Sequence, residues 1–188
     1  PFEYNETTLQ GYYFFFSASF DGESIGVEAF EDLNGNGLYD QNEPFVDEDN
    51  DGIWDNNNDW IGAFKCLEWE NGVCNEVGEC VGAQLWDRNL CGGGICEIAV
   101  MGDNGLAYSE NYMIPGDVPA FRVYISNTEG IYDANGLIES SEYITPAEVA
   151  PWENFGTYFY EKIDFTDMMQ EETGEGCTDS TACNYDSD

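Results

Sequence analysis

The segment from residue 30 to residue 59 consists of two consecutive copies of one acidic loop motif. The first copy reads FEDLNGNGLYDQNEP (30–44) and the second reads FVDEDNDGIWDNNND (45–59), so the repeat has a period of 15 residues. In both copies a glycine, Gly37 or Gly52, follows acidic or amide residues at alternate positions. Calcium loops have this pattern, because they take oxygen ligands from positions 1, 3, 5, 7, 9 and 12 and need glycine at position 6 for a sharp turn. The repeat therefore predicts two calcium-binding loops.

The repeat also predicts which residues bind each ion, for a total of about two Ca²⁺ ions. The first copy satisfies the full pattern D-x-[DN]-x-[DN]-G-x5-E. In the second copy position 12 is Asn58, a weaker ligand, for which the adjacent Asp59 can substitute. The expected ligands of the first ion are Asp32, Asn34, Asn36, the backbone carbonyl of Leu38, Asp40 and Glu43. The other expected ligands of the second ion are Asp47, Asp49, Asp51, the backbone carbonyl of Ile53, and Asp55.

Two other interpretations explain this segment less well. A solvated acidic linker has no reason to place glycines at the same loop position, or to follow each glycine with an apolar pair. A pair of EF-hands needs a helix on both sides of each loop, and only about three residues separate these two loops. The segment instead resembles the short-period calcium repeats of secreted proteins, such as dockerin loops and thrombospondin type 3 repeats.

The charge of the chain is strongly one-sided. It has 39 Asp and Glu residues against 4 Lys and Arg residues, a formal net charge of −35, and no histidine. Such a charge repels nucleic acids and anionic membrane surfaces, and it attracts divalent cations. Because the chain has no histidine, it lacks the commonest general base and the commonest transition-metal ligand. No run of 18 apolar residues is present. We therefore expect neither nucleic-acid binding nor membrane insertion.

Seven cysteines indicate an oxidising, extracellular or cell-surface location with disulfide bonds. Zinc binding is the rival interpretation, but no Cys-x2-Cys pair is present. The spacing predicts three local disulfides, Cys66–Cys74, Cys91–Cys96 and Cys177–Cys183. Cys80 is then left free or bonds another chain. An alternative pairing joins Cys80 to Cys91 or Cys96.

Short segments rich in aromatic and β-branched residues alternate with turn residues along the chain, which predicts an all-β fold. The expected strands cover residues 12–20, 59–64, 81–86, 97–101, 119–125 and 156–165. Asn-Gly pairs at 71–72 and 135–136 predict turns, the first at the tip of a hairpin. Residues 145–152 have the capping residues of one short helical turn. The fold class we predict is an antiparallel β-sandwich, jelly-roll or immunoglobulin-like, with an inserted calcium-loop segment and little helix.

The composition also suggests how the chain is divided. Residues 1–170 are expected to form the β-sandwich domain, which carries the calcium insert at 30–59 and a cysteine-bearing hairpin at 65–80. Residues 171–188 change to small, acidic and polar residues and read as a separate tail. This tail either binds a further cation or carries no ligand.

Two stretches resemble known families. The series DWIGAF (59–64), CVG (80–82), Trp86 and PAFRVY (119–124) resembles a β-sandwich module of secreted and cell-surface proteins from marine and environmental bacteria. The tail sequence GCTDSTACNYD (176–186) is similar to a cysteine-containing repeat near the ends of such exported proteins. The resemblance implies an exported β-sandwich protein. Here the calcium insert precedes the first motif, and the cysteine hairpin interrupts it.

These features predict an extracellular, calcium-stabilised structural protein, as an adhesin or as a self-assembling subunit of a surface filament or layer. The apolar run YYFFF (12–16) and the extended segment before it (1–11) predict self-association by strand addition from the N-terminus. No nucleophile elbow, phosphate loop or H-E-x-x-H motif is present, so we expect no enzyme activity. The alternative is a carbohydrate-binding module that stacks glycans on tryptophans, with Trp54, Trp60, Trp69, Trp86 and Trp152 as candidates.

Overall fold

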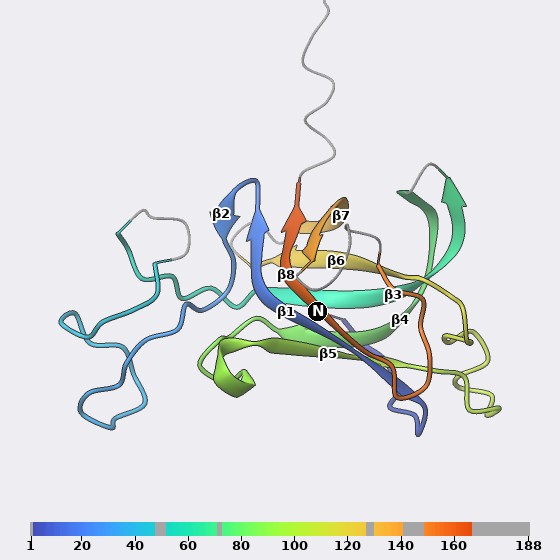
Figure 1. Ribbon diagram of the computed structural model, residues 1–188, viewed down its shortest axis with the longest axis horizontal. Helices are drawn as coiled ribbons and strands as arrows, with labels where there is room; N and C mark the ends of the chain where they lie inside the picture. The colour runs from blue at the N-terminus through green and yellow to red at the C-terminus, as the bar shows by residue number, and fades with distance from the viewer. Residues whose placement is uncertain (1, 48–51, 71–72, 127–129, 141–148, 167–188) are drawn as a thin grey trace, which may run out of the picture.

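The computed structural model describes residues 2–47, 52–70, 73–126, 130–140 and 149–166, and its secondary structure is almost entirely β, as predicted. A single 3-10 turn, η1 (Gly92–Gly94), lies before β5. Figure 1 shows the arrangement of the strands. They are β1 (Gln10–Phe20), β2 (Glu23–Ser24), β3 (Trp60–Glu70), β4 (Val73–Leu85), β5 (Cys96–Met101), β6 (Pro119–Ile125), β7 (Gly130–Ser140) and β8 (Thr157–Phe165).

The strands form one continuous sheet in the order β2-β1-β8-β7-β6-β3-β4, and β5 also pairs with β1. β7 joins the two halves, because one part of it pairs with β6 and the other part with β8. β1 and β8 are parallel, whereas the other described pairs are antiparallel. The expectation of antiparallel strands throughout is therefore wrong at this pair. The connection between β1 and β8 spans most of the chain, so it imposes no hairpin geometry on them.

Aromatic side chains from both halves of the sheet meet in one hydrophobic core. The ring of Phe121 on β6 packs edge-on against Tyr13 and Phe15 of β1, with centroid distances of 5.6 and 5.3 Å. Phe15 also stacks on Tyr160 of β8. Each such pair contributes about 0.5–1.5 kcal/mol beyond the burial of its surface. The inner faces of β1 and β8 therefore lie opposite that of β6.

The expected strands are present, but one local prediction, the turn at 135–136, fails. Along β6, Phe121, Val123 and Ile125 are buried, as their alternation predicts. The pair at 135–136 is not a turn, because β7 runs through it with a register shift between Ala134 and Leu137. An Asn-Gly pair suits such an irregularity as well as a turn, since glycine accepts unusual backbone angles. Residues 149–152 are not helical, while 145–148 lie outside the described residues, as do the hairpin tip 71–72 and the tail from 167 onward.

β4 and β5 approach each other closely without strand pairing. A Cβ atom added to Gly82 of β4 would lie 2.2 Å from the carbonyl oxygen of Ala99 on β5, which is well inside van der Waals contact. Only glycine permits this approach. Gly82 therefore allows the two halves of the sheet to close on the core along this edge.

We expect Gly82→Ala to lower the free energy of unfolding by about 1–3 kcal/mol, because backbone must move to admit the methyl group. Gly92→Ala is the matched control, since a Cβ there meets nothing within 4 Å. Urea denaturation followed by circular dichroism measures both. Equal midpoints for the two variants would contradict the close packing of β4 on β5.

Candidate calcium site

The calcium insert leaves the sheet after β2 and returns to it at β3, and it projects from one side of the sheet (left in Figure 1). Its base is held by main-chain hydrogen bonds to the segment that follows β4. The N–H of Val27 donates to the carbonyl of Trp86 at 2.9 Å, and the N–H of Arg88 donates to the carbonyl of Val27 at 3.1 Å. The insert is thus attached to the sheet and is not a free linker.

Asp59 joins the end of the insert to the sheet. Its Oδ2 accepts the N–H of Gly26 at 2.9 Å, and its Oδ1 accepts the N–H of Ser126, just after β6, at 2.8 Å. The side chain is buried, and the Asp59 carbonyl accepts the N–H of Trp86. The sequence did not indicate this role. A ligand role for Asp59 or for the exposed Asn58 in the second loop stays a prediction.

The carboxylate of Asp32 organises the first loop. Its Oδ1 accepts the N–H of Gly35 at 2.6 Å and of Asn36 at 3.1 Å, and its Oδ2 accepts the N–H of Gly37 at 2.8 Å. These bonds lower the pKa of Asp32, with the bond from Gly37 as the largest cause, because they stabilise the charged form. Gly37 has a φ of 75°, which the sharp turn at position 6 requires.

The remaining predicted side chains of the first loop meet at Asp40 and Glu43. Oδ2 of Asp40 accepts the side-chain amides of Asn34 at 2.5 Å and of Asn36 at 3.0 Å. The Glu43 carboxylate accepts the N–H of Leu33 at 2.8 Å and of Asp40 at 3.0 Å. The structure therefore brings Asn34, Asn36 and Glu43 to Asp40, whereas the Asp32 carboxylate binds the backbone of the turn. The side chain of Leu38 is exposed, as expected for a residue that contributes only its carbonyl.

The second loop is described in part, because Asp49 and Asp51 lie outside the described residues. Asp47 repeats the contact of its counterpart Asp32: its Oδ2 accepts the N–H of Gly52 at 3.1 Å. The other oxygen, Oδ1, is buried and has no hydrogen-bond partner among the described residues. A buried oxygen without a donor is one that a cation can satisfy.

Aromatic residues at equivalent positions hold the two loops together. Phe30 and its counterpart Phe45 form an antiparallel bridge between the loops. The ring of Tyr39 stacks on Trp54, its counterpart, at 4.4 Å between centroids. The ring of Phe30 packs edge-on against both Tyr39 and Trp54. The two copies therefore pair around a small aromatic core of their own.

The tryptophans that were candidates for stacking on glycans differ in exposure and do not form one surface. Trp86 and Trp152 are 0% and 1% exposed, so neither can stack on a glycan. Trp54 packs on Tyr39 and donates its indole N–H to the Glu28 carbonyl at 3.0 Å. Trp69, at 41% exposed, lies on β3 in the cysteine hairpin. The prediction for Trp86 and Trp152 is therefore wrong, since both belong to the hydrophobic core.

Two of the predicted disulfides are confirmed: Cys66–Cys74 links β3 to β4, and Cys91–Cys96 closes the loop around η1. The alternative pairing of Cys80 with Cys91 or Cys96 is wrong. Cys80 pairs with none of the described cysteines, and burial raises the pKa of its thiol. The Cys177–Cys183 pair lies outside the described residues.

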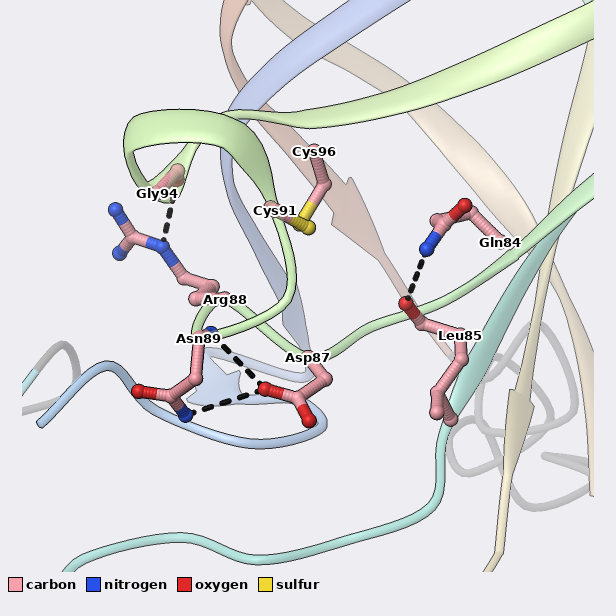
Figure 2. The surroundings of a disulfide bond; sticks show 8 residues. All are labelled: Gln84, Leu85, Asp87, Arg88, Asn89, Cys91, Gly94 and Cys96. Carbon is pink, nitrogen blue, oxygen red and sulfur yellow. Dashed lines mark hydrogen bonds between the residues drawn. A yellow bond between two sulfur atoms is a disulfide. The ribbon is translucent and has the colours of Figure 1, made fainter. Parts of the chain in front are cut away.

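The Cys91–Cys96 loop also supports the base of the insert. Figure 2 shows that the Arg88 Nε–H donates to the Gly94 carbonyl, at 3.0 Å, and that Asn89 donates to Asp87. The Asn89 amide group also donates to the carbonyl of Glu28 and accepts the N–H of Phe30, both at 3.0 Å. Asn89, just before the disulfide loop, therefore holds the chain where it enters the first loop, and Arg88 connects this segment to the disulfide loop.

The atoms of the first loop that could act as metal ligands are of the kind that calcium binds. All are carboxylate, amide or carbonyl oxygens, the ligands that Ca²⁺ prefers. Within the described ranges, no three acidic or cysteine side chains converge into a preassembled metal cluster. Instead, backbone N–H groups hold Asp32 and Glu43, and the amides of Asn34 and Asn36 point their nitrogens at Asp40. Calcium binding would need these two amides to turn their oxygens inward.

A scan against protein-family models finds no matching family, and neither the curated proteins nor the solved structures contain a match to this chain. Among the described residues, no helix has the length and apolar character to cross a membrane. The site must therefore be interpreted from its own geometry.

In calcium-free solution we expect the Asp32 carboxyl to titrate below the ordinary aspartate pKa of about 3.9. Its pKa is depressed in the folded loop, so its contribution to loop stability is present above the unfolded pKa and is lost as the pH falls through the folded pKa. NMR titration of the carboxyl carbon measures the pKa. The Gly37 amide resonance should shift in the same step, and a midpoint at or above 3.9 would contradict the geometry of the loop.

Proposed function

We propose that this protein is an extracellular structural protein whose loop insert is stabilised by calcium, and that it has no catalytic activity. The observation that carries the proposal is the first loop, where the Asp32 carboxylate accepts three backbone N–H groups and three other selected residues, Asn34, Asn36 and Glu43, contact Asp40. A bound calcium ion would supply a divalent charge among these oxygens. Asp32, Asn34, Asn36, Asp40 and Glu43, with the carbonyl of Leu38, would hold it.

The net charge supports a structural role for the ion. A charge of −35 produces self-repulsion that opposes a compact state. Calcium bound at the loops reduces this repulsion, and its binding free energy adds to the free energy of folding when the site forms only in the folded chain. Extracellular calcium loops bind at about 10⁻⁴–10⁻³ M, which matches external calcium concentrations.

The two disulfides support an extracellular location, because such bonds persist in oxidising surroundings. Both close short loops at the periphery of the sheet, the hairpin of β3 and β4 and the loop before β5. Cys96 is fully buried in the hydrophobic core, whereas Cys66 and Cys74 are partly exposed.

We expect calorimetry on the full chain to detect two calcium sites with Kd of about 10⁻⁴–10⁻³ M, and thermal stability to rise with calcium. Asp32→Ala should weaken the first site more than Asn34→Ala, because it removes a charge and the acceptor of three N–H groups. Glu31→Ala, an exposed position beside the loop, is the control and should bind as the wild type does. No heat of binding at millimolar calcium would refute the proposal.

We also propose that the protein self-associates, through the aromatic face formed by Phe14 and Phe16 of β1 and Phe159 of β8. The rings of Phe14 and Phe159 stack at 4.8 Å, and Phe16 and Phe159 are 39% and 40% exposed. Exposed apolar patches on such a charged surface are typical of interaction sites. Calcium would favour association, because it reduces the repulsion between subunits.

Strand addition from the N-terminus has less support than the aromatic face. The ring of Phe2 packs edge-on against Phe64, with 5.4 Å between centroids. The Thr7 hydroxyl donates to the Gly102 carbonyl at 2.9 Å, and the Gly102 N–H donates to the Leu9 carbonyl at 2.7 Å. The described part of the N-terminal segment is therefore bound to its own chain. Donating it to a neighbour would break these contacts first.

Light scattering in millimolar calcium should show a mass above that of the monomer, which falls after chelation. The double variant Phe16→Ser, Phe159→Ser should remain monomeric, because it removes the exposed rings of the aromatic face. Leu106→Ser, which removes a comparably exposed apolar side chain elsewhere, should associate like the wild type. A wild-type chain that stays monomeric in calcium would refute self-association.

A further inference from the structure

We propose that the cavity bounded by β1, β2, β8 and Arg88 binds a small tetrahedral oxyanion, of the sulfate or phosphate type. The cavity has a volume of about 250 Å³. Sites for drug-sized ligands measure roughly 300–1,000 Å³, whereas a water molecule occupies roughly 30 Å³ in the liquid. The cavity therefore has room for a polyatomic ion, or for the charged group of a larger molecule.

The lining of this cavity combines two basic side chains with three hydroxyl groups. The residues that matter here are Ser17, Ser19, Gly22, Ser24, Arg88 and Lys162. The chain has only 4 basic residues against 39 acidic ones. Of the other two, Lys65 forms an ion pair with Asp117 at 3.0 Å, and the guanidinium of Arg122 lies over the ring of Phe64. Half of the basic residues of a strongly negative chain therefore line one cavity.

The pairing of the strands brings these side chains to one place. Ser17 of β1 lies opposite Lys162 of β8 in the parallel pair. On the other edge of β1, Ser19 lies opposite Ser24 of β2 in the antiparallel pair. The turn between β1 and β2 contains Gly22, which has a φ of 90°. The cavity thus lies over the end of β1, where three strands meet.

An irregularity in two strands explains why polar residues face outward here. Successive side chains of a strand point to opposite faces, so buried residues are normally two positions apart. In β1, however, the buried apolar residue after Phe15 is Ala18, and in β8 the one after Tyr160 is Ile163. The inner face therefore changes phase in both strands at the same level. Lys162, two positions after Tyr160, lines the cavity instead of the core for this reason.

Arg88 reaches the cavity from the segment that follows β4. Its backbone N–H donates to the Val27 carbonyl at 3.1 Å, and its Nε–H donates to the Gly94 carbonyl at 3.0 Å (Figure 2). Burial lowers the pKa of Arg88, against a smaller raising by the charge of Glu28. A guanidinium has five N–H donors in a planar fork, which suits oxyanions. A bound anion would offset the cost of burying this charge.

Asp164 orients the side chains on the opposite side of the cavity. Its Oδ1 accepts a hydrogen bond from Nζ of Lys162 at 2.8 Å and another from the hydroxyl of Ser19. An ammonium group has three N–H donors, and the Lys162 side chain is 36% exposed, so it can bind Asp164 and a ligand together. The Ser17 hydroxyl donates to the Glu161 carbonyl at 3.2 Å, and rotation about one bond would turn it to a ligand.

The positions of the donors favour a tetrahedral ion over a carboxylate. They come from β1, β2, β8 and the segment after β4, and therefore from several sides of the cavity. A tetrahedral oxyanion presents oxygens in four directions, whereas a carboxylate presents two oxygens in one plane. The same charged group exists as a free ion and as a monoester on a larger molecule, and both would be recognised by the same donors.

The competing explanation is that Arg88 and Lys162 serve only as internal partners of Glu28 and Asp164. Each of these carboxylates has another donor as well: Glu28 accepts the N–H of Asp55 at 3.3 Å, and Asp164 accepts the hydroxyl of Ser19. Neither carboxylate is therefore devoted to its basic neighbour. Internal pairing alone predicts no saturable binding of anions, so the two explanations can be separated by experiment.

The test is NMR titration of the full chain with sodium sulfate in calcium-free buffer, at an ionic strength held constant with sodium chloride. The amide resonances of Ser17, Ser24 and Lys162 should shift and saturate in the millimolar range. Methyl sulfate is the second titrant. Saturation by both ions would mean that the cavity admits a monoester, and saturation by sulfate alone would mean that it takes the free ion. The titration needs no calcium, so its failure leaves the proposed calcium function untouched.

Lys162→Gln should weaken sulfate binding at least about tenfold, because it removes a charge-assisted hydrogen bond. Lys65→Gln is the matched control: it makes the same change in net charge at a lysine that also pairs with a carboxylate but lies outside the cavity, and it should bind as the wild type does. Asp164→Asn should strengthen binding, because it removes the negative charge beside Lys162. If Lys162→Gln fails to fold, Ser17→Ala, which removes one donor, should weaken binding in its place.

Two outcomes would overturn the inference. The first is a wild-type chain whose resonances respond to sulfate no more than to chloride at the same ionic strength. The second is equal weakening by Lys162→Gln and Lys65→Gln, which would show that only the net charge of the chain matters. Saturable binding that Lys162→Gln weakens and Lys65→Gln leaves unchanged would place the anion in this cavity.

Discussion

The two hydrogen bonds accepted by the Asp59 carboxylate connect the parts of this molecule. One oxygen binds the N–H of Gly26 at the start of the insert, and the other binds the N–H of Ser126 at the end of β6. Because Asp59 itself lies just before β3, a single buried side chain fixes three segments that are distant in sequence. The position of the insert relative to the sheet depends on this arrangement.

Asp59 illustrates how the whole chain accommodates its acidic residues. With 39 acidic residues and 4 basic ones, salt bridges can satisfy only a small fraction of the carboxylates. Backbone N–H groups take their place at turns: Asp103 accepts the N–H of Gly105, and Asp117 accepts that of Ile114. Such bonds orient carboxylates without reducing the net charge. The net negative charge therefore remains after folding.

The sequence predicts those features that depend on local patterns. The period of 2 in PAFRVYI identifies the inner face of β6, and the loop repeat selects Asn34, Asn36, Asp40 and Glu43, which the structure brings into contact. Two disulfides follow from short spacing. What could not be predicted depends on contacts between distant segments. The parallel pairing of β1 with β8, the anchoring by Asp59 and the position of Glu28 beside Asp55 have no local signal.

The burial of Trp86 and Trp152 has a related cause. An aromatic residue in a short apolar run is compatible with a surface platform or with a core, and only the tertiary packing decides between them. Here the Trp152 indole N–H donates to the Val100 carbonyl on β5, and Gly102 makes room for its ring. The sequence pattern around Trp152 shows neither that the Val100 carbonyl accepts its indole N–H nor that Gly102 leaves space for its ring.

The aromatic pairing of the two loops bears on the proposed calcium role, because a weakly bound ion could not order so long an insert by itself. Fixing a loop costs conformational entropy, which a single ion of millimolar affinity cannot offset for some thirty residues. The Phe30–Phe45 bridge, the Tyr39–Trp54 stack and the Asp32 turn already hold the described loop backbone in place. In the proposed calcium-bound state the ion would have only to reorient side chains, such as the amides of Asn34 and Asn36. Because the same aromatic contacts join both loops, they hold the described backbone of the two loops in place together.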